Sequence, residues 1–256
     1  MPSSPLLLAL TTATDACGVA LWHDGGLAAE MTVHLPRRHG ARLAPLIRDA
    51  LAHSGGLDAQ DLDAVALTAG PGSYTGLRIG ASTAKGLCAA TDAALAPVPT
   101  LEALAEAGRR PGCVAPGCVA PGDVLGAVLR SRRGEVYAAA FRLQADGPAD
   151  DALTPVFEAE ALETDEAAQR FEALRRDDDA PSGAIWLLGS GAGRVAGALP
   201  EEDAFRLRAD ALPTAAAVAR LGVARGAAGT VADAAAFEPR YLKDFHATPR
   251  PGSVFE

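Results

Sequence analysis

Lysine is nearly absent from this sequence: only Lys85 and Lys243 occur among 23 basic residues in a chain of 256. Acidic residues number 32, so the formal net charge is −9 at pH 7. A chain with this charge repels phosphate backbones, and we do not expect it to hold nucleic acid on its own. The hydrophobic share of 49% and the charged share of 21% are those of an ordinary globular protein with a sizeable core.

Cysteine is also scarce, and its spacing argues against a metal or redox motif. None of the four cysteines forms a Cys-x-x-Cys pair. Cys17 and Cys88 stand in apolar runs and are expected to be small buried thiols rather than part of a disulfide or a zinc site. Cys113 and Cys118 belong to a repeated Pro-Gly-Cys-Val-Ala join, which we interpret as a duplicated surface loop rather than a cysteine pair.

Long hydrophobic runs are missing. The apolar residues Leu6–Leu10 near the N-terminus lack a basic flank and are too few for a signal peptide or a membrane span. They are typical of a β-strand. We therefore expect a cytoplasmic protein that does not cross a membrane.

The usual catalytic motifs of hydrolases are missing as well. The five histidines include no His-x-x-x-His pair that could bind a catalytic metal. No Gly-x-Ser-x-Gly elbow is present, since Gly72-Ser73-Tyr74 lacks the following glycine. We therefore expect no catalytic set and no bound metal.

A glycine-rich string is the most specific feature that the sequence does contain. Residues 69–80 read Ala-Gly-Pro-Gly-Ser-Tyr-Thr-Gly-Leu-Arg-Ile-Gly, after a short apolar run and before a segment with helical spacing. A strand that turns on glycines into a helix leaves the first N–H groups of the helix free for an anion. The spacing nevertheless fits neither the dinucleotide fingerprint nor a P-loop. The loop residues of interest are Gly70, Gly72, Ser73 (the expected helix cap), Gly76 and Arg78.

Hydrophobic patterns predict the order βββαβαβ for the first half of the chain, and the second half repeats this order less clearly. In the first half, strands are expected at Leu6–Leu10, Cys17–Trp22, Leu27–Val33, Ala64–Leu67 and Ala94–Val98, with helices around Leu43–Leu51 and Tyr74–Ala90. In the second half, strands are expected at Val124–Leu129, Val136–Arg142, Pro155–Glu158 and Ile185–Leu188, with helices at Thr164–Arg176 and Thr214–Arg225.

The repeated order predicts an α/β fold of two tandem RNase H-like (actin-like, ASKHA) halves, each with a mixed sheet flanked by helices. We place the first domain at residues 1–100 and the second at 101–256, with a C-terminal segment packing back on the first. An active nucleotide-cleaving member of this architecture needs carboxylates in the cleft between the halves to hold Mg²⁺. Thr11 and Arg130 stand where those carboxylates are wanted, and Asp15 lies in the following turn.

Four segments of the sequence resemble the TsaB (YeaZ) family of bacterial tRNA threonylcarbamoyladenosine (t6A) modification. They are Leu8–Cys17, Gly70–Gly80, Arg133–Tyr137 and Glu238–Leu242, in the same order along nearly the whole chain. The family usually has Asp where Thr11 stands, and it often has another Asp where Arg130 stands. The resemblance implies a non-catalytic paralogue of the transferase subunit TsaD, with no cofactor of its own. It also implies pairing with TsaD and the ATPase TsaE, only indirect contact with tRNA, and a homodimer when alone.

The resemblance further implies a partner surface on the two helices of the first half. The stripes that we assign to this surface are apolar at helical spacing. They comprise Leu43, Leu46, Ile47, Leu77, Ala81 and Ala84. The same stripes could instead face the sheet of their own domain, and periodicity alone does not separate the two.

Two other functions are compatible with the predicted architecture. An actin-fold phosphotransferase would hold ATP between Gly70–Gly76 and Gly189–Gly193, and it would turn ATP over without a partner. An M22-type peptidase is suggested by an older glycoprotease name of the same family, but it needs a metal pair or a nucleophile set. The sequence favours an accessory subunit that is not itself an enzyme.

Overall fold

Two five-stranded mixed sheets repeat one topology, in the orders β3-β2-β1-β4-β5 and β8-β7-β6-β9-β10. In each sheet the first three strands of the repeat pair antiparallel, and the last two join them parallel. The predicted α/β fold of two halves with mixed sheets and flanking helices is confirmed. The computed structural model describes most of the chain, namely residues 5–34, 39–109, 118–132, 134–144, 153–176, 183–201 and 204–243.

The strands of the first sheet and helix α2 agree with the predicted ones to within one residue at their ends, whereas α1 begins four residues before the predicted helix. The strands are β1 (Leu7–Thr11), β2 (Cys17–His23), β3 (Gly26–Val33), β4 (Ala64–Thr68) and β5 (Ala94–Val98). The helices are α1 (His39–His53) and α2 (Tyr74–Thr91), with a 3-10 turn η1 (Ala59–Asp61) between them. Every residue of β1 is buried because this strand is central and covered on both faces.

The second sheet departs further from expectation. Its strands are β6 (Val124–Arg130), β7 (Glu135–Leu143), β8 (Leu153–Glu163), β9 (Ile185–Leu188) and β10 (Phe205–Arg208). The helices of this part of the chain are α3 (Thr100–Arg109), α4 (Thr164–Arg176), α5 (Ala192–Ala196) and α6 (Ala215–Ala227). The sequence patterns do not predict α3, α5 or β10, and β8 is longer than the predicted strand.

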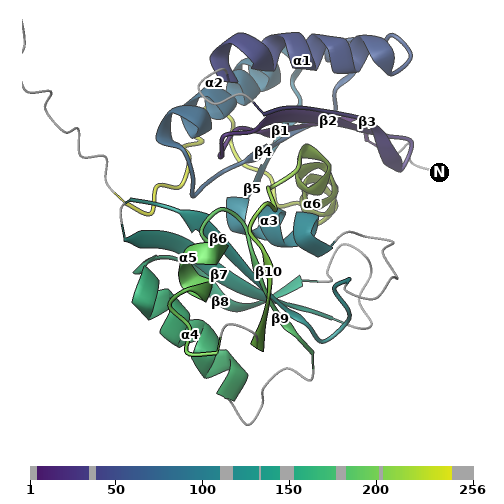
Figure 1. Ribbon diagram of the computed structural model, residues 1–256. Coiled ribbons are helices and arrows are strands. Elements are labelled where there is room, and N and C mark those ends of the chain that lie inside the picture. The colour runs from purple at the N-terminus through teal and green to yellow at the C-terminus, as the bar shows by residue number, and fades with distance from the viewer. Residues whose placement is uncertain are drawn as a thin grey trace, which may run out of the picture.

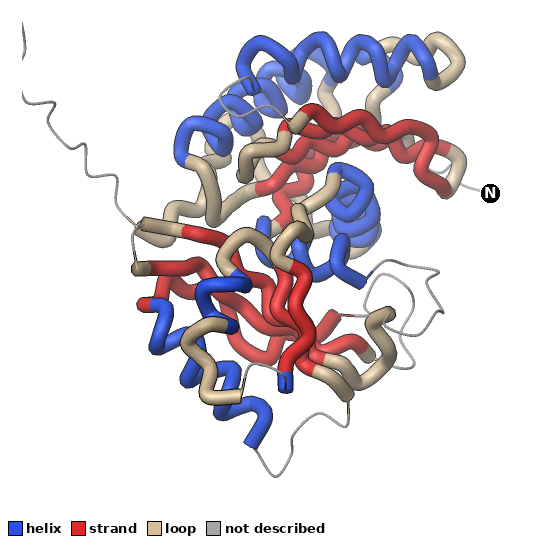
Figure 2. Tube along the Cα trace, viewed as in Figure 1, coloured by secondary structure: helices blue, strands red, loops and turns tan. Residues whose placement is uncertain are grey.

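Helices and sheets alternate in five layers (Figure 1, Figure 2). Helices α1 and α2 cover the outer face of the first sheet, α6 and α3 lie between the sheets, and α4 and α5 cover the outer face of the second. Apolar side chains fill the spaces between successive layers. Helix α6 follows β10 in the sequence, yet it packs on β1, β2, β4 and β5 of the first sheet. Within the described ranges, no helix is long and apolar enough to cross a membrane.

The cysteines follow the sequence-based expectation in part. Cys17 and Cys88 are free and buried, and burial raises the pKa of both thiols, that of Cys17 to about 11. Cys118, however, is disulfide-bonded, so the expectation of no cysteine pair is wrong at this position. No spacing motif marks this bond, since a disulfide depends on which loop segments meet in space. Cys113 lies outside the described residues.

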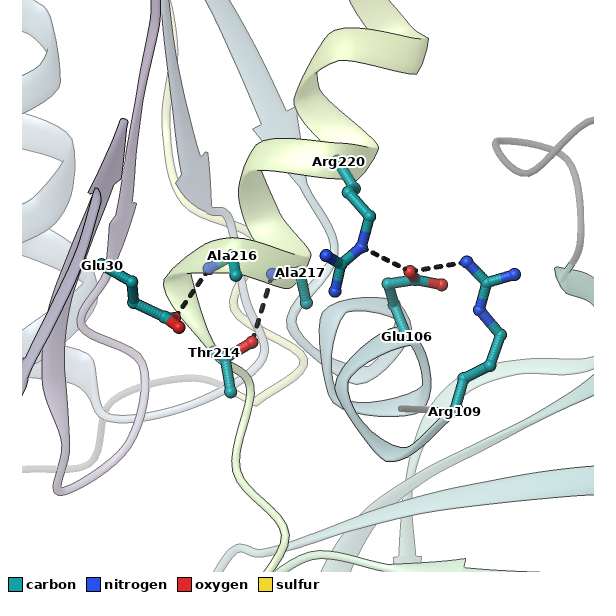
Figure 3. A network of polar contacts seen from close by, with 7 residues as sticks. All are labelled: Glu30, Glu106, Arg109, Thr214, Ala216, Ala217 and Arg220. Atoms are coloured by element: carbon teal, nitrogen blue, oxygen red, sulfur yellow. Dashed lines mark hydrogen bonds and ion pairs between the residues drawn. The ribbon is translucent and has the colours of Figure 1, made fainter. Parts of the chain in front are cut away.

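Ion pairs between α3 and α6 connect the two sheets (Figure 3). The carboxylate of Glu106, a residue only 3% exposed, accepts hydrogen bonds from Arg109 Nη2 at 2.8 Å and from Arg220 Nε at 2.9 Å. One helical turn away, Arg225 Nη2 donates to Glu102 Oε2 at 2.7 Å. Because α3 packs on the second sheet and α6 on the first, the pairs that Arg220 and Arg225 make with α3 connect the two sheets, whereas the Arg109 pair lies within α3.

The first turn of α6 is also fixed from two sides. Thr214 is the N-cap, and its Oγ1 accepts a hydrogen bond from the Ala217 N–H at 3.1 Å. The carboxylate of Glu30, on β3, accepts from the Ala216 N–H at 2.9 Å (Figure 3). A carboxylate at this end of a helix is stabilising because it satisfies a free N–H and complements the helix dipole.

Replacing Glu106 with alanine should lower the free energy of unfolding by about 3–5 kcal/mol, because two partly buried guanidinium groups lose their carboxylate. Urea unfolding followed by circular dichroism measures this change. The matched control is Glu160→Ala, which removes an exposed pair with Arg170 and should cost at most about 1 kcal/mol. Equal losses in the two variants would contradict the connecting role of Glu106.

Candidate functional site

The glycine string forms the turn between strand β4 and helix α2, as predicted. Ser73 is the N-cap of α2, and its Oγ accepts a hydrogen bond from the Gly76 N–H at 3.2 Å, which confirms the expected cap. Gly70 takes a φ of +112°, a conformation that favours glycine. The turn thus has the outline of an anion-binding loop, and its use depends on what lies against it.

The turn between β1 and β2 fills the space against this loop. A Cβ atom added to Gly72 would overlap the carbonyl oxygen of Ala13, and one added to Gly76 would overlap the carbonyl oxygen of Thr12. The N–H of the N-cap residue donates to Ala13 O at 2.7 Å. These glycines therefore serve the close approach of the chain's own backbone, and a phosphate group has no room on this side of the loop.

The C-terminal segment and the start of α3 hold the loop from another side. The Arg240 N–H donates to Ala69 O at 2.7 Å, and a Cβ atom on Gly70 would overlap the Arg240 carbonyl oxygen. Gly70 and Thr100 exchange two hydrogen bonds, from Gly70 N to Thr100 Oγ1 at 3.1 Å and from Thr100 N to Gly70 O at 2.9 Å. Three segments far apart in the sequence thus converge on one loop.

Thr11 and Arg130, which replace the expected carboxylates, bind neighbouring backbone instead. The buried Thr11 Oγ1 donates to Pro213 O at 3.2 Å. Arg130 is exposed, and its Nε donates to Ser190 O at 2.8 Å. Asp15 is exposed in the β1–β2 turn, as expected. The described residues contain no group of three or more His, Cys, Asp or Glu side chains that could hold a metal ion.

His39 supports the β1–β2 turn, a role that the sequence analysis missed. It is the first residue of α1 and is buried. Its Nε2 lies 2.9 Å from Thr14 O and 3.3 Å from Ala16 O, so the ring N–H donates to carbonyl groups of the turn. An isolated histidine has no spacing pattern, and only the fold brings it to this turn.

Five of the six residues assigned to the partner surface lie in the core of the chain instead. Leu43 and Leu77 are each 1% exposed, and only Leu46 is half-buried. The sheet accounts for the helical apolar stripes, because α1 packs on β2 and β3 and α2 packs on β4. Whether the two helices meet a partner stays a prediction. Leu43, Leu77 and Ala84 have almost no exposed surface to offer it, whereas Ile47 and Ala81 each line a surface pocket. The five core residues are Leu43, Ile47, Leu77, Ala81 and Ala84.

The outer side of the two helices carries a groove, which we name the α1–α2 groove. One part, of about 550 Å³, lies between α1, α2 and η1, and a second part of about 500 Å³ continues along the first turns of α2. Thr83 is half-buried and lines both parts. Ile47 of the predicted partner surface lines the first part, and most of the other helical lining residues lie opposite the buried stripe. The lining includes Ala44, Ile47, Leu57, Ile79, Ser82, Thr83 and Leu87.

Substituting Gly76 with alanine should destabilise the chain by about 1–3 kcal/mol, because the new methyl group must displace the β1–β2 turn. The matched control is Gly86→Ala in the same helix, where a Cβ meets nothing within 4 Å. That change should stabilise by about 0.5–1 kcal/mol through the better helix propensity of alanine. Thermal unfolding of both variants measures the difference, and two shifts of the same sign would contradict this packing.

A protein-family model supports the resemblance. The model described as "TsaD: tRNA N6-adenosine threonylcarbamoyltransferase" matches residues 30–182, which is more than half of the chain. The match includes both helices of the groove, the glycine string and most of the second sheet.

Similar proteins and a solved structure also support the resemblance to the TsaB (YeaZ) family. The tRNA threonylcarbamoyladenosine biosynthesis protein TsaB of Escherichia coli (strain K12) is 39% identical over 142 residues, 55% of this chain and 57% of that protein. The protein of that name from Bacillus subtilis (strain 168) is 32% identical over 136 residues, 53% of this chain and 55% of that protein. The chain spans about half the length of the curated relatives it matches.

The structure of YeaZ from Pseudomonas aeruginosa superposes with a TM-score of 0.76 at 29% identity and covers 93% of this chain and 100% of its own. The chain belongs to the TsaD family, as a member of its TsaB (YeaZ) group.

Proposed function

We propose that this chain is a non-catalytic accessory subunit of the bacterial t6A modification machinery. Its curated relatives are named for threonylcarbamoyladenosine biosynthesis. The matching family model carries the name of a tRNA N6-adenosine threonylcarbamoyltransferase. These names support a role in t6A synthesis, and the geometry of the glycine loop supports an accessory one.

The filled glycine loop is the observation that carries the accessory role. Backbone oxygens of Thr12, Ala13 and Arg240 lie against its glycines at distances that leave no space for a Cβ atom. A phosphate-binding loop needs that space for its ligand. Thr11 and Arg130 stand where carboxylates would hold Mg²⁺ in an active enzyme. Their side chains instead donate hydrogen bonds to backbone carbonyl groups. A phosphotransferase or an M22-type peptidase therefore has no supporting observation in the described residues.

The α1–α2 groove is the surface that we propose for a TsaD-like partner. It is concave and mostly apolar, and it lies on two regular helices, which suits a helix of another protein. In this proposal a TsaE-like ATPase joins the pair, and a second copy of the chain occupies the groove when the partner is missing. The net charge of −9 supports contact with tRNA only through the partner, in the cytoplasm.

The isolated chain should neither hydrolyse ATP nor modify tRNA, because its own backbone fills the side of the glycine loop that faces the β1–β2 turn. A coupled assay of ATP turnover on the purified chain tests this expectation. Steady-state turnover that disappears on changing Gly72 or Gly76 would reject the accessory role and favour an actin-fold phosphotransferase.

Replacing Thr83 with glutamate should weaken binding of the TsaD-like partner by about a hundredfold or more, because the new charge would be buried unpaired in the groove. The test is co-purification of the tagged chain with the TsaD-like and TsaE-like proteins of the same organism, followed by titration. The wild-type chain should co-purify with both. t6A formation by the reconstituted complex should fall in parallel.

Two further variants make the groove test specific. Thr154→Glu introduces the same charge on the exposed edge strand β8 and should leave binding unchanged. Leu77→Glu places a charge in the core and should unfold the chain, as circular dichroism would show. A folded Thr83→Glu variant that binds as tightly as the wild type would exclude the groove as the docking surface.

A further inference from the structure

A small polar pocket lies where α2 meets the C-terminal segment, next to the α1–α2 groove. Its volume is about 290 Å³, and we name it the α2 cationic pocket. Arg78 and Lys85 of α2 both line it, together with Glu238. The rings of Tyr74 and Tyr241 form its rim, with their centroids 5.0 Å apart.

The Arg78 guanidinium is held in place without being neutralised. Its Nη1 donates to Tyr74 Oη at 2.7 Å, and its central carbon lies 5.3 Å from the centroid of the Tyr74 ring. The guanidinium is exposed, and no described carboxylate lies within ion-pair distance of it. An arginine has five N–H donors in a fixed fork, so most of them remain for a ligand.

Lys85 adds a second positive charge from the same helix face. Its Nζ donates to Phe237 O at 3.1 Å, and no described carboxylate lies within ion-pair distance of it. Seven residues of helix separate it from Arg78 by about 10 Å along the axis, so one small group does not bridge both. Lys85 instead makes the pocket attractive to anions, while Arg78 offers the hydrogen bonds.

Several other basic groups near the core have carboxylate partners. Glu106, Glu102 and Glu172 each accept from at least one arginine. Two cations and a single carboxylate, that of Glu238, line this pocket, so its lining carries a net positive charge that a group of another molecule can balance. Charge complementarity and the position of the pocket beside the proposed docking groove both favour the partner as the source of that group.

We propose that the α2 cationic pocket binds an aspartate or glutamate side chain of the partner subunit, paired in bidentate fashion with Arg78. This inference rests on the proposed function, in which that subunit docks on the α1–α2 groove. The groove and the pocket share Tyr74, Arg78 and Ser82, so one partner surface reaches both. The groove then supplies apolar contact area, and the ion pair fixes the register of the two subunits.

A carboxylate fits this pocket better than a phosphate group. The planar guanidinium fork matches a carboxylate in two parallel hydrogen bonds. The Glu238 carboxylate also lines the pocket and repels a doubly charged phosphate more strongly than a singly charged carboxylate. With two cations and one anion in the lining, a single negative charge gives a neutral pocket.

The test compares Arg78→Gln with Arg206→Gln in titrations against the TsaD-like subunit at low and at high salt. Arg206 is exposed on β10 of the second sheet and serves as the matched control. Arg78→Gln should weaken binding about tenfold at low salt and reduce the salt dependence of the dissociation constant. Arg206→Gln should change neither. A charge reversal, Arg78→Glu, should be rescued by a lysine at one acidic position of the partner.

Each other outcome overturns the proposal in a recognisable way. A wild-type complex that Arg78→Gln leaves unchanged rejects the carboxylate pairing but keeps the proposed function. A wild-type chain that binds no TsaD-like subunit rejects the proposed function, and the pairing with it. If Arg78→Gln weakens only self-association, the acidic group belongs to a second copy of the chain. If inorganic phosphate alone binds the free chain in isothermal titration calorimetry, and Arg78→Gln abolishes that binding, the pocket is a phosphate site.

Discussion

The close approach of the β1–β2 turn to helix α2 is the constraint on which the rest of the structure depends. Gly72 and Gly76 let the backbone of Ala13 and Thr12 lie directly on the start of the helix, and Gly80 leaves room for the Thr12 side chain. This contact fixes the rotation of α2 about its axis, so that its apolar stripe meets the sheet and its opposite side faces outward. A side chain at any of the three glycines would push the helix away from β1. The string is therefore specific because packing demands it, whether or not a ligand binds.

The helices between the two sheets also restrict motion of one half of the molecule against the other. Two-lobed enzymes close around a ligand by moving one lobe against the other. Here α3 and α6 fill the space between the sheets with apolar side chains and with the buried carboxylate of Glu106. The C-terminal segment adds a further connection, because it bonds to Ala69 of the first half and Lys243 pairs with Glu135 of the second. These contacts favour one fixed arrangement of the two halves and disfavour a hinge motion that would open and close a cleft between them.

The sequence allowed prediction of the elements with strong periodicity and missed those that depend on tertiary contacts. Strands β1 to β5 and both groove helices follow from alternating or helical apolar spacing. Helix α5 and strand β10 are too short for a periodic signal, and α3 directly follows β5, where the domain join was expected. Periodicity also could not tell whether Leu43 and Leu77 face the sheet or a partner, since both give the same pattern. Gly76 contacts the backbone of Thr12, which lies far away in the sequence, and no rule based on neighbouring residues predicts that contact.

A rigid helix is a physical advantage for a subunit that acts by binding. Association loses translational and rotational freedom and orders mobile side chains, and a surface that is already ordered avoids part of that cost. Helix α2 meets this requirement because Ser73 caps its start and the β1–β2 turn holds its inner side. Arg78 projects from the same fixed helix and is steadied by Tyr74, so its guanidinium fork is oriented before a partner arrives. The packing that fills one side of the glycine loop thus also orders the outer side of the helix, where we propose that a partner protein docks.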